Sequence, residues 1–464
     1  MIDFYNTINK KKEKFIPINK DKITLYTCGP TVYNYAHIGN FRAYIFEDLL
    51  RRTLEYAGYN VFQVMNITDI DDKTIKRSID DGVSLEELTN KYTDAFFEDL
   101  DKLNIIRAHE YPRATKFIEQ IIEMIQKLVD KGFAYQTDDN SVFFRVSQFS
   151  EYGKLANLNP DDMKIGDRVD NDEYEKEEIR DFALWKGYKK EDGDVHWDSP
   201  WGKGRPGWHI ECSVMSTFYL GSSFDIHCGG VDNIFPHHEN EIAQSKCALD
   251  DKFVNYWLHN EHLLVENQKM SKSLGNFYTI RDILDKGYKS EAIRYVLISS
   301  HYRQKLNFTM HRLDDAQKAI NKLRELVRRL NEVENSIDKD SNIDEINKNF
   351  LNDFKRNLYD DLNISGSLGA LFTWANKIFS LLDKNNLNKN ESKKVKAILL
   401  DVDRIIGIIE TKDDISEEEK KLILLREAAR KNKDWEESDR IREELSNRGI
   451  IIEDTPTGTI WKFK

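Results

Sequence analysis

One stretch near the start of the chain limits the possible fold more than any other. Residues 23–28 are rich in β-forming side chains and end at Gly29-Pro30, which is a turn signal. Residues 40–57 carry a helical pattern of apolar side chains that Gly58 can terminate, and residues 61–67 are typical of a second buried strand. This strand–loop–helix–strand order predicts an α/β fold that begins with a parallel, nucleotide-binding sheet of the Rossmann type.

The rest of the chain divides into further regions. At about 150 residues per domain, its length suggests roughly three domains. Sheet-like segments return at 223–227 and 253–259, and helical periodicity dominates from 312 onward. We predict a sheet domain in two halves, at 1–114 and 206–270, with an insertion at 115–205 between them. A lysine-containing loop region at 271–311 and an α-helical bundle at 312–410 follow. The chain then continues into a small module at 411–464, whose main element is one basic helix at 420–448.

Composition places the chain among globular proteins. It is 40% hydrophobic and 32% charged, which does not fit a wholly disordered chain. We expect neither a membrane span nor a secretory signal, because no apolar run is long enough and the first residues are not basic and then apolar. Four cysteines are too few for a disulfide framework and suit the reducing cytoplasm. The net charge of −12 does not exclude a nucleic-acid partner, because such binding depends on where Lys and Arg lie.

The loop after the first strand is a candidate anion site. Residues 29–40 join that strand to the predicted helix, and ligands of open parallel sheets bind at the carboxyl ends of strands. The helix N-terminus offers free N–H groups and the positive end of its dipole. His37 adds a hydrogen-bond donor, and Gly39 allows a ligand to approach the backbone closely. The alternative is that Gly29-Pro30 is only a turn and His37 only a capping residue.

A second candidate is the lysine pair Lys269 and Lys272. They lie three residues apart in a loop that also contains serine and glycine, and their charges suit a polyanion such as a triphosphate. Phosphoryl chemistry relies on such cations more than on acid–base groups. A solvated surface loop is the alternative.

A third candidate is a set of possible metal ligands. His237 and Glu241 are four residues apart, which places them on one face of a helix, whereas the side chain four residues after His238 is an isoleucine. Cys28 ends the first strand, and Cys212 lies in a separate segment. Thiolates, an imidazole and a carboxylate together favour zinc. Each residue alone could equally be a buried, inert side chain.

The end of the second strand carries the fourth candidate. Thr68 is placed to line a pocket at the edge of the sheet. Asp69, Asp71 and Asp72 follow it, and three acids there could hold magnesium or cap the next helix. We favour capping for Asp71 and Asp72.

Taken together, five ordered motifs make the chain resemble the cysteinyl-tRNA synthetases, a family of class I aminoacyl-tRNA synthetases. The resemblance extends from the N-terminus to Trp461. Its HIGH and KMSKS elements are typical of the class, and Cys28, Cys212, His237 and Glu241 are typical of the cysteine branch. The motifs are Cys28-Gly29-Pro30-Thr31-Val32-Tyr33, His37-Ile38-Gly39-Asn40, Gly207-Trp208-His209-Ile210-Glu211-Cys212, Phe235-Pro236-His237-His238-Glu239-Asn240-Glu241 and Lys269-Met270-Ser271-Lys272-Ser273.

The resemblance implies a reaction and its partners. ATP and L-cysteine would form cysteinyl-adenylate and pyrophosphate, and the cysteinyl group would pass to the 3′-terminal adenosine of tRNA-Cys. Magnesium would accompany the ATP, one zinc ion per chain would bind the thiolate of the cysteine substrate, and the enzyme would be a cytoplasmic monomer. The regions become a catalytic domain with a connective insertion, a KMSKS and stem-contact region, a bundle and an anticodon-binding module.

The resemblance also implies roles for individual residues. Catalysis would fall to His37, Lys269 and Lys272, and ATP would be bound by these three residues with Gly29, Gly39 and Asn40. The amino acid pocket would be lined by Thr68, Trp208 and His227, and zinc would be bound by Cys28, Cys212, His237 and Glu241. The anticodon would be contacted by Arg430, Asp439 and Asp454.

Two positions depart from the pattern. The HIGH element ends in Asn40, whose amide can donate a hydrogen bond but carries no positive charge. Cys228 stands where glycine is common in relatives, and we leave it outside the zinc set.

Three other functions remain to be weighed. A ligase that joins cysteine to a small amine would lack the module at 411–464, and a non-catalytic tRNA-binding relative would not need His37, the lysines and four metal ligands together. A zinc hydrolase is disfavoured because the sequence has no HExxH pairing.

Overall fold

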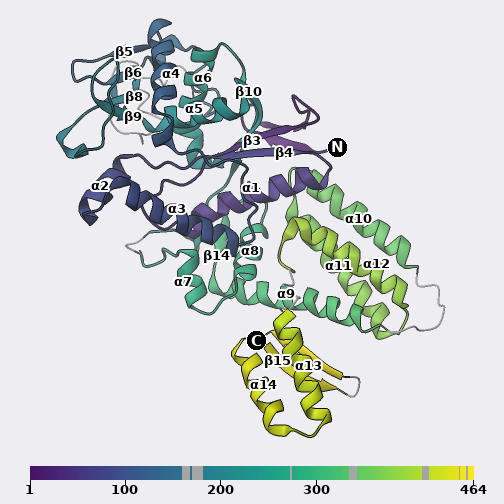
Figure 1. The fold of residues 1–464 in the computed structure, drawn as a ribbon. Coiled ribbons are helices and arrows are strands. Elements are labelled where there is room, and N and C mark those ends of the chain that lie inside the picture. Colours follow the sequence, from purple (N-terminus) through teal and green to yellow (C-terminus); the bar gives the residue numbers. More distant parts are fainter. Residues whose placement is uncertain are drawn as a thin grey trace. The chain divides into compact units, whose positions relative to one another are not determined.

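The strand–loop–helix–strand unit at the N-terminus forms as predicted. β3 (Ile23–Thr27) leads into α1 (Ile38–Tyr56), and β4 (Val61–Met65) follows. β3 and β4 join β10 (Ser223–Gly230) and β11 (Phe253–Asn260) in a four-stranded sheet (Figure 1). The strand order is β11-β10-β3-β4, and every neighbouring pair is parallel. Gly58 adopts a φ of 92° just after α1, a conformation that favours glycine at a helix stop. The predicted α/β class with a parallel sheet is therefore confirmed.

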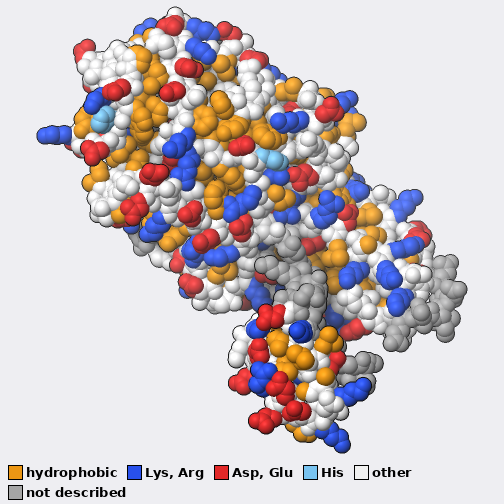
Figure 2. Space-filling view, in the orientation of Figure 1, with side chains coloured by type: hydrophobic (Ala, Val, Ile, Leu, Met, Phe, Trp, Pro, Cys, Tyr) orange, Lys and Arg blue, Asp and Glu red, His pale blue; other side chains and the backbone are white. Residues whose placement is uncertain are grey.

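The computed structural model describes residues 1–158, 168–169, 181–271, 274–333, 342–409, 417–448, 450–455 and 458–463. They form two compact units, Met1–Ile408 and Ile409–Lys464. Among these residues, no helix is both long and apolar enough to cross a lipid bilayer. On the face drawn in Figure 2, the described Lys and Arg side chains are intermixed with Asp and Glu.

Helices cover both faces of the parallel sheet. Side chains of a strand alternate between its faces, so Tyr26 and Cys28 point one way and Thr27 the other. The first face packs against α5 (Trp208–Leu220) and α6 (Glu239–Leu249), and the second faces α1. A hairpin of β1 (Asp3–Asn6) and β2 (Lys11–Lys14), which we did not predict, contacts β11.

The insertion contains a second sheet. Its strands are short and mostly buried, in the order β5-β6-β8-β7 with β9 paired to β8. Aromatic and apolar side chains of this sheet share a core with α4, α5 and α6. Most of the charged stretch 167–181 lies outside the described residues. The elements between β4 and α5 are α2 (Asp72–Asp81), α3 (Leu85–Lys102), α4 (Ile118–Asp130), β5 (Ala134–Gln136), β6 (Val142–Phe144), β7 (Arg168–Val169), β8 (Asp181–Gly187) and β9 (Gly204–Pro206).

A small three-stranded sheet and a set of helices complete the first unit. In the sheet order β13-β12-β14, β12 pairs antiparallel with β13 and parallel with β14. Leu313, Ile320 and Leu323 of the predicted apolar stripe are buried on α9. The elements are β12 (Leu263–Val265), β13 (Gln268–Lys269), α7 (Ile280–Asp285), α8 (Ser290–Ile298), β14 (Leu306–Phe308), α9 (Met310–Asn331), α10 (Ile343–Tyr359), α11 (Ile364–Asp383) and α12 (Lys389–Ile406).

The C-terminal unit corrects one prediction. Instead of one helix over 420–448, it contains α13 (Glu417–Lys431) and α14 (Trp435–Asn447), followed by a hairpin of β15 (Ile450–Thr455) and β16 (Gly458–Phe463). The break occurs because Lys433 has a φ of 59°, in the left-handed region, and the Asp434 side chain caps the second helix by accepting from the N–H of Glu437. Ile441, Leu445 and Ile450 are buried in its core.

A buried cluster of charges joins α1 to the helices of the first unit. Asp48 of α1 accepts hydrogen bonds from Arg52 Nε at 2.8 Å and from Arg294 Nη2 of α8 at 2.6 Å. Arg294 also donates to the carbonyl of Ile406, at the end of α12. The side chains of Asp48 and Arg294 are 0% and 1% exposed. The carboxylate therefore compensates two guanidinium groups that have little access to water.

We expect Asp48→Ala to lower the free energy of unfolding by about 3–5 kcal/mol, because it leaves two buried guanidinium groups without their carboxylate. Urea unfolding followed by tryptophan fluorescence measures the change. Asp81→Ala is the matched control, since it removes the carboxylate of an exposed pair with Arg77 and should leave the unfolding curve unchanged. Equal behaviour of the two variants would contradict this account of Asp48.

Candidate functional site

A cavity of about 730 Å³ opens at the carboxyl ends of all four strands of the parallel sheet. Residues that follow β3, β4, β10 and β11 line it, and so do the first residues of α1 and α5. This is the position at which open parallel sheets bind their ligands. Of the residues predicted to be functional, the lining includes Cys28, Gly29, His37, Gly39, Asn40, Thr68, Trp208, Cys212, His237 and Lys269.

The N-terminus of α1 lies at this cavity, with His37 as its capping residue. His37 Nδ1 accepts a hydrogen bond from the N–H of Asn40 at 3.2 Å, and the N–H of His37 donates to Asn40 Oδ1 at 3.1 Å. His37 therefore caps the helix and also lines the cavity, so the two alternatives from the sequence are compatible. Asn40 uses its side-chain oxygen in this cap, which leaves its amide N–H₂ as the group that could donate to a ligand.

Two glycines keep the walls close together. A Cβ atom on Gly29 would lie 1.7 Å from the carbonyl oxygen of Asn66, and one on Gly39 would lie 2.9 Å from His37 Nδ1. Gly29 also donates its N–H to Asn66 Oδ1, and Asn66 in turn donates to Thr68 Oγ1 at 3.1 Å. Larger side chains at either glycine would push apart the loop, β4 and the capping residue.

Four predicted metal ligands meet in the wall of the cavity. One donor atom from each of Cys28, Cys212, His237 and Glu241 lies within 4.8 Å of the other three. Cys28 follows β3, Cys212 lies on α5, His237 lies in the π-helical turn Ile234–His238 just before α6, and Glu241 lies in the first turn of α6. His237 Nε2 is 3.1 Å from Glu241 Oε1. Two sulfurs, one nitrogen and one oxygen match the donors of a four-coordinate zinc site.

The electrostatics of this group favour a cation. Burial raises the pKa of Glu241 to about 8 and lowers that of His237 to about 3. The pKa of the Cys28 thiol is also raised, first by its contact with Cys212 and then by burial. A metal ion would reverse these effects for the thiols and the carboxyl, since it stabilises their deprotonated forms. The imidazole of His237 is already neutral, as ligation requires.

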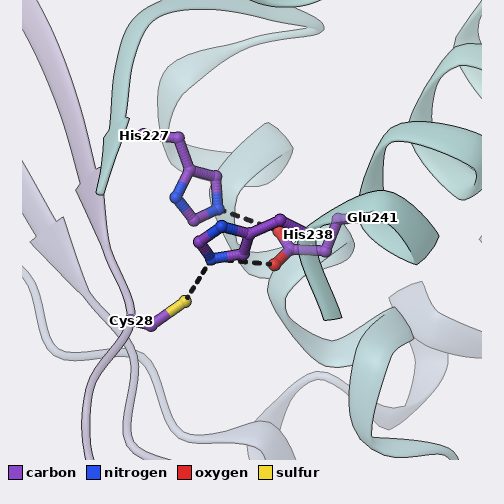
Figure 3. Close-up of side chains that lie close together, drawn as sticks. All are labelled: Cys28, His227, His238 and Glu241. Atoms are coloured by element: carbon purple, nitrogen blue, oxygen red, sulfur yellow. Dashed lines mark hydrogen bonds and ion pairs between the residues drawn. The ribbon is translucent and has the colours of Figure 1, made fainter. Parts of the chain in front are cut away.

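A second donor set overlaps the first (Figure 3). Cys28 and Glu241 belong to both, and His227 and His238 replace Cys212 and His237. Cys28 Sγ is 3.3 Å from His238 Nε2, and His227 Nε2 is 3.0 Å from Glu241 Oε2. Both histidines are fully buried and neither lines the cavity. The set that contains Cys212 and His237 is therefore the one that a ligand in the cavity can reach.

The residues predicted for an amino acid pocket are placed differently from one another. Thr68 and Trp208 line the cavity, and the indole of Trp208 stacks on the His237 ring with a centroid distance of 4.3 Å. His227 does not line it, because its ring lies behind Glu241 and stacks on Trp257. The prediction that His227 lines this pocket is therefore not met, and its contact with Glu241 makes it a support for a ligand residue.

Lys269 lies on β13 and lines the cavity with an exposed side chain. Asn276 holds this segment, because its Nδ2 donates to the carbonyl of Lys269 and its Oδ1 accepts from the N–H of Ser271. Lys272 lies outside the described residues. The structure therefore places one of the two predicted lysines beside the helix N-terminus and the donor set.

The acidic residues after β4 have structural partners. Asp71 caps α2 as predicted, by accepting from the N–H groups of Lys73 and Thr74. Asp72 is the first residue inside α2, not a cap, and its carboxylate pairs with Lys186 and Arg205 of the insertion. Asp69 accepts from the N–H and the hydroxyl of Thr115. These contacts leave no free acidic triad for magnesium at the described end of β4.

In the C-terminal unit, the three residues predicted to contact an anticodon lie on different elements. Arg430 is half-buried near the end of α13, and Asp439 is exposed on α14. Asp454 belongs to β15. Their proposed role is not tested by these positions.

Sequence reasoning missed several residues behind the donor set. His209 Nδ1 lies 2.9 Å from His237 Nδ1, and His238 Nδ1 lies 2.8 Å from His259 Nε2. His209 follows Trp208 and His238 follows His237, both of which were selected, whereas β11, which carries His259, contains no selected residue. That adjacency was the available signal, but partners from different elements can be matched only when the fold is known.

Comparison with known proteins identifies the family. Residues 14–318 match the model described as the class I (C) tRNA synthetase catalytic domain, and residues 412–461 match the cysteinyl-tRNA ligase anticodon binding domain. The cysteine–tRNA ligase of Brachyspira hyodysenteriae is 52% identical, over 100% of this chain and 99% of its own length. That of Chlamydia trachomatis serovar A is 50% identical, over 98% of each chain.

Solved structures agree on the fold. A methionyl-tRNA synthetase from Mycobacterium tuberculosis, in complex with methionyl-adenylate, aligns with a TM-score of 0.60 at 14% identity, over 84% of this chain and 90% of that one. A putative arginyl-tRNA synthetase from Campylobacter jejuni aligns with a TM-score of 0.58 at 13% identity, over 85% and 94%. With the two family models and the near-complete relatives, these findings show that the chain belongs to the cysteine–tRNA ligase family of class I tRNA synthetases.

Proposed function

We propose that the protein is a cysteine–tRNA ligase, which activates L-cysteine with ATP and transfers it to the 3′-terminal adenosine of tRNA-Cys. One observation carries the proposal beyond family membership. Three members of the donor set, Cys28, Cys212 and His237, line the cavity that His37 and Lys269 also line, and Glu241 lies behind them. A thiol-binding site and a phosphate-binding site in one cavity are what the activation of cysteine by ATP requires.

The first step joins the two substrates. The carboxylate oxygen of cysteine attacks the α-phosphorus of ATP, an O–P bond forms, and pyrophosphate leaves as the bond to the β-phosphate breaks. We assign His37 and Asn40 to the nucleotide, because both line the cavity at the N-terminus of α1. Lys269, with Lys272, would neutralise the charge that develops on the phosphates, and magnesium carried by ATP would share it.

The second step releases AMP. A hydroxyl of the terminal adenosine attacks the carbonyl carbon of the adenylate, and the bond between that carbon and the phosphate oxygen breaks. The protein mainly positions the reactants in both steps, so no covalent bond between the enzyme and the substrate is needed. In this scheme the C-terminal unit would read the anticodon, with Arg430, Asp439 and Asp454 as the residues we propose for base or phosphate contacts.

The residues in the cavity wall fit a zinc ion. Cys28, Cys212 and His237 would hold it at the surface of the cavity, and Glu241 would complete the set from behind. When bound, zinc supplies a soft Lewis acid that prefers the sulfur of cysteine, as thiolate, to the hydroxyl of serine. Trp208 stacks on His237 and therefore fixes the plane of that imidazole at the pocket.

This site accounts for discrimination that shape cannot provide. Cysteine and serine differ by sulfur in place of oxygen, and a hydrophobic pocket separates such near-isosteres by only about 10–200-fold. Discrimination of about 10⁴–10⁵-fold without editing needs roughly 5.5–7 kcal/mol. In this cavity, the difference in strength between a metal–sulfur bond and a metal–hydroxyl bond can supply such an energy.

The proposal is tested by transfer of labelled cysteine to tRNA-Cys, with ATP and magnesium present, beside a labelled serine control. Acid-precipitable cysteine without serine is the expected result. Cysteine-dependent pyrophosphate exchange without any charging would instead indicate a ligase that uses a small amine. Neither activity, in folded protein that contains zinc, would contradict both enzymatic functions.

We expect Cys212→Ser to lose zinc and to accept serine. Loss of a residue that hydrogen-bonds to a metal ligand lowers metal affinity by about 10–100-fold. Removal of the thiolate ligand itself should lower zinc affinity by more than that. Selection of cysteine over serine should then fall toward the about 10–200-fold available from shape alone. Zinc is measured by elemental analysis after dialysis, and selection by pyrophosphate exchange with each amino acid.

Cys247→Ser is the matched control, because Cys247 is also buried on a helix but belongs to neither donor set. It should keep the zinc content and the selectivity of the unsubstituted protein. Full zinc and normal rejection of serine in Cys212→Ser would show that the metal is held elsewhere.

We expect Lys269→Ala to lower the rate of adenylate formation by about 10²–10³-fold, the usual cost of losing one group that stabilises transition-state charge. Pyrophosphate exchange measures this step without tRNA. Lys127→Ala, an exposed lysine on α4 that does not line the cavity, should leave the rate unchanged. A normal rate in Lys269→Ala would remove this lysine from the mechanism.

A further inference from the structure

Two tyrosines stand at the edge of the cavity, in the loop that joins β3 to α1, and the proposed chemistry uses neither. Tyr33 and Tyr35 line the cavity and are 36% and 37% exposed. By contrast, Cys212 and His237 line it with side chains that are 1% and 2% exposed. We call the exposed part of the lining the rim of the cavity. A ligand that extends from the cavity into solvent has to pass this rim.

The ring of Tyr35 is held in place from the side of α3. It meets the ring of Tyr92, which lies on α3, edge to face with a centroid distance of 5.3 Å. The guanidinium carbon of Arg281, on α7, lies 5.0 Å from the centre of the Tyr35 ring. Arg281 is itself fixed to α3, because its Nη2 donates to the carbonyl of Ala95 at 3.2 Å and to Glu98 Oε2 at 2.7 Å. The exposed part of the Tyr35 ring is therefore the part turned away from α3.

The support beneath this ring does not depend on a ligand. Nε of Arg281 lies 3.3 Å from Oδ1 of Asp99, whose side chain is 1% exposed, so the guanidinium that contacts Tyr35 is tied to the buried side of α3 as well as to its surface. A contact surface that is already ordered loses less conformational freedom when it binds, and it therefore binds more tightly. Tyr35 thus offers a preformed aromatic surface at the rim.

Among the three substrates of the proposed reaction, one has to cross the rim. Cysteine would be held at the donor set, and the phosphates of ATP at the N-terminus of α1 and Lys269. Sites for small ligands enclose most of the ligand surface, so neither substrate needs an exposed aromatic residue. The terminal adenosine of tRNA would enter the same cavity but stays joined to the rest of the RNA, so the nucleotides before it must pass the rim. Unpaired bases of RNA are commonly bound by stacking on aromatic side chains.

We propose that Tyr35 binds the 3′ end of the tRNA, with its ring stacked on the base of a nucleotide that precedes the terminal adenosine. This inference rests on the proposed function. Tyr35 lies two residues before His37, the cap of α1, so one short loop would contact both the RNA end and the ATP. The stacked base would set how far the terminal adenosine reaches into the cavity, and with it the distance from the adenosine hydroxyl to the carbonyl carbon of the adenylate.

The test compares Tyr35→Ala, which removes the ring, with Tyr35→Phe, which keeps it, in the full chain. We expect kcat/KM for tRNA-Cys in charging to fall about 5–150-fold in Tyr35→Ala, the loss that corresponds to one base–aromatic stack. Tyr35→Phe should charge at nearly the rate of the unsubstituted protein, because the face of the ring is retained. Pyrophosphate exchange, which needs no tRNA, should fall far less in Tyr35→Ala than charging does.

A shortened RNA identifies the part of the tRNA that Tyr35 contacts. Dissociation constants are measured for intact tRNA-Cys and for tRNA-Cys without its unpaired 3′ nucleotides, each with the unsubstituted protein and with Tyr35→Ala. The substitution should weaken binding of the intact tRNA only, since the shortened one lacks the base that stacks. Equal weakening of both would place the contact elsewhere on the RNA and overturn the proposal.

Tyr188→Ala is the matched control. Tyr188 is also an exposed tyrosine, at 41%, and its ring meets that of His196 with a centroid distance of 5.0 Å, but it does not line the cavity. It should keep the charging rate, the exchange rate and both dissociation constants of the unsubstituted protein.

The remaining outcomes separate this inference from the proposed function. Normal charging by Tyr35→Ala, or a loss of exchange as large as the loss of charging, would overturn the role of Tyr35 and leave the proposed function standing. If the unsubstituted chain performs cysteine-dependent exchange but charges no tRNA, the proposed function is itself wrong and the inference about Tyr35 falls with it.

Discussion

The burial of two thiols, a carboxyl and several imidazoles at one point, away from water, is the constraint on which the rest of the site depends. Burial raises the pKa of Glu241 to about 8 and lowers the pKa of His237 and His227 to about 3. In the absence of a cation, the carboxyl is therefore protonated and both imidazoles are neutral near pH 7. Such a group is costly unless its members pair with one another or with a metal. The histidines behind it pair through one ring nitrogen each, His209 Nδ1 with His237 Nδ1 and His238 Nδ1 with His259 Nε2, which leaves Nε2 of His237 directed at Glu241.

The parallel sheet brings these donors and the nucleotide end of the cavity together. Because the strands are parallel, Cys28 after β3 and the loops after β4, β10 and β11 all meet at one edge. The same loop that follows Cys28 leads into α1, whose N-terminus is capped by His37 nine residues later. A single strand–loop–helix unit therefore supplies one of the proposed metal ligands and the proposed anion site. Their separation is set by the backbone, and the close packing of Gly29 on Asn66 leaves it little freedom.

The sequence was most informative where function depends on local pattern. The β-forming residues of β3, the helix stop at Gly58 and the four-residue spacing of His237 and Glu241 are short-range features, and the structure follows them. Such local patterns could not predict contacts between segments that lie far apart in the sequence. The family resemblance implied that His227 lines the pocket, but its ring faces Glu241. Asp72 was expected to cap a helix but pairs with Lys186 and Arg205, more than a hundred residues away. The break between α13 and α14 depends on one residue with positive φ, which lysine does not signal.

In the proposed function, selectivity would depend on the rigidity of the site as much as on the identity of the proposed ligands. A site that distinguishes sulfur from oxygen by the strength of one bond to a metal must prevent the metal from adjusting to the weaker ligand. His227 of β10 lies 3.0 Å from the proposed ligand Glu241 of α6, and Tyr26, its neighbour on β3, belongs to the same buried cluster as Cys212 of α5. A movement of either helix would have to disturb the central strands of the sheet. The register of β3 on β10 thus ties the donor set to the central strands of the sheet, and in the proposed function the fold itself would contribute to the choice between cysteine and serine.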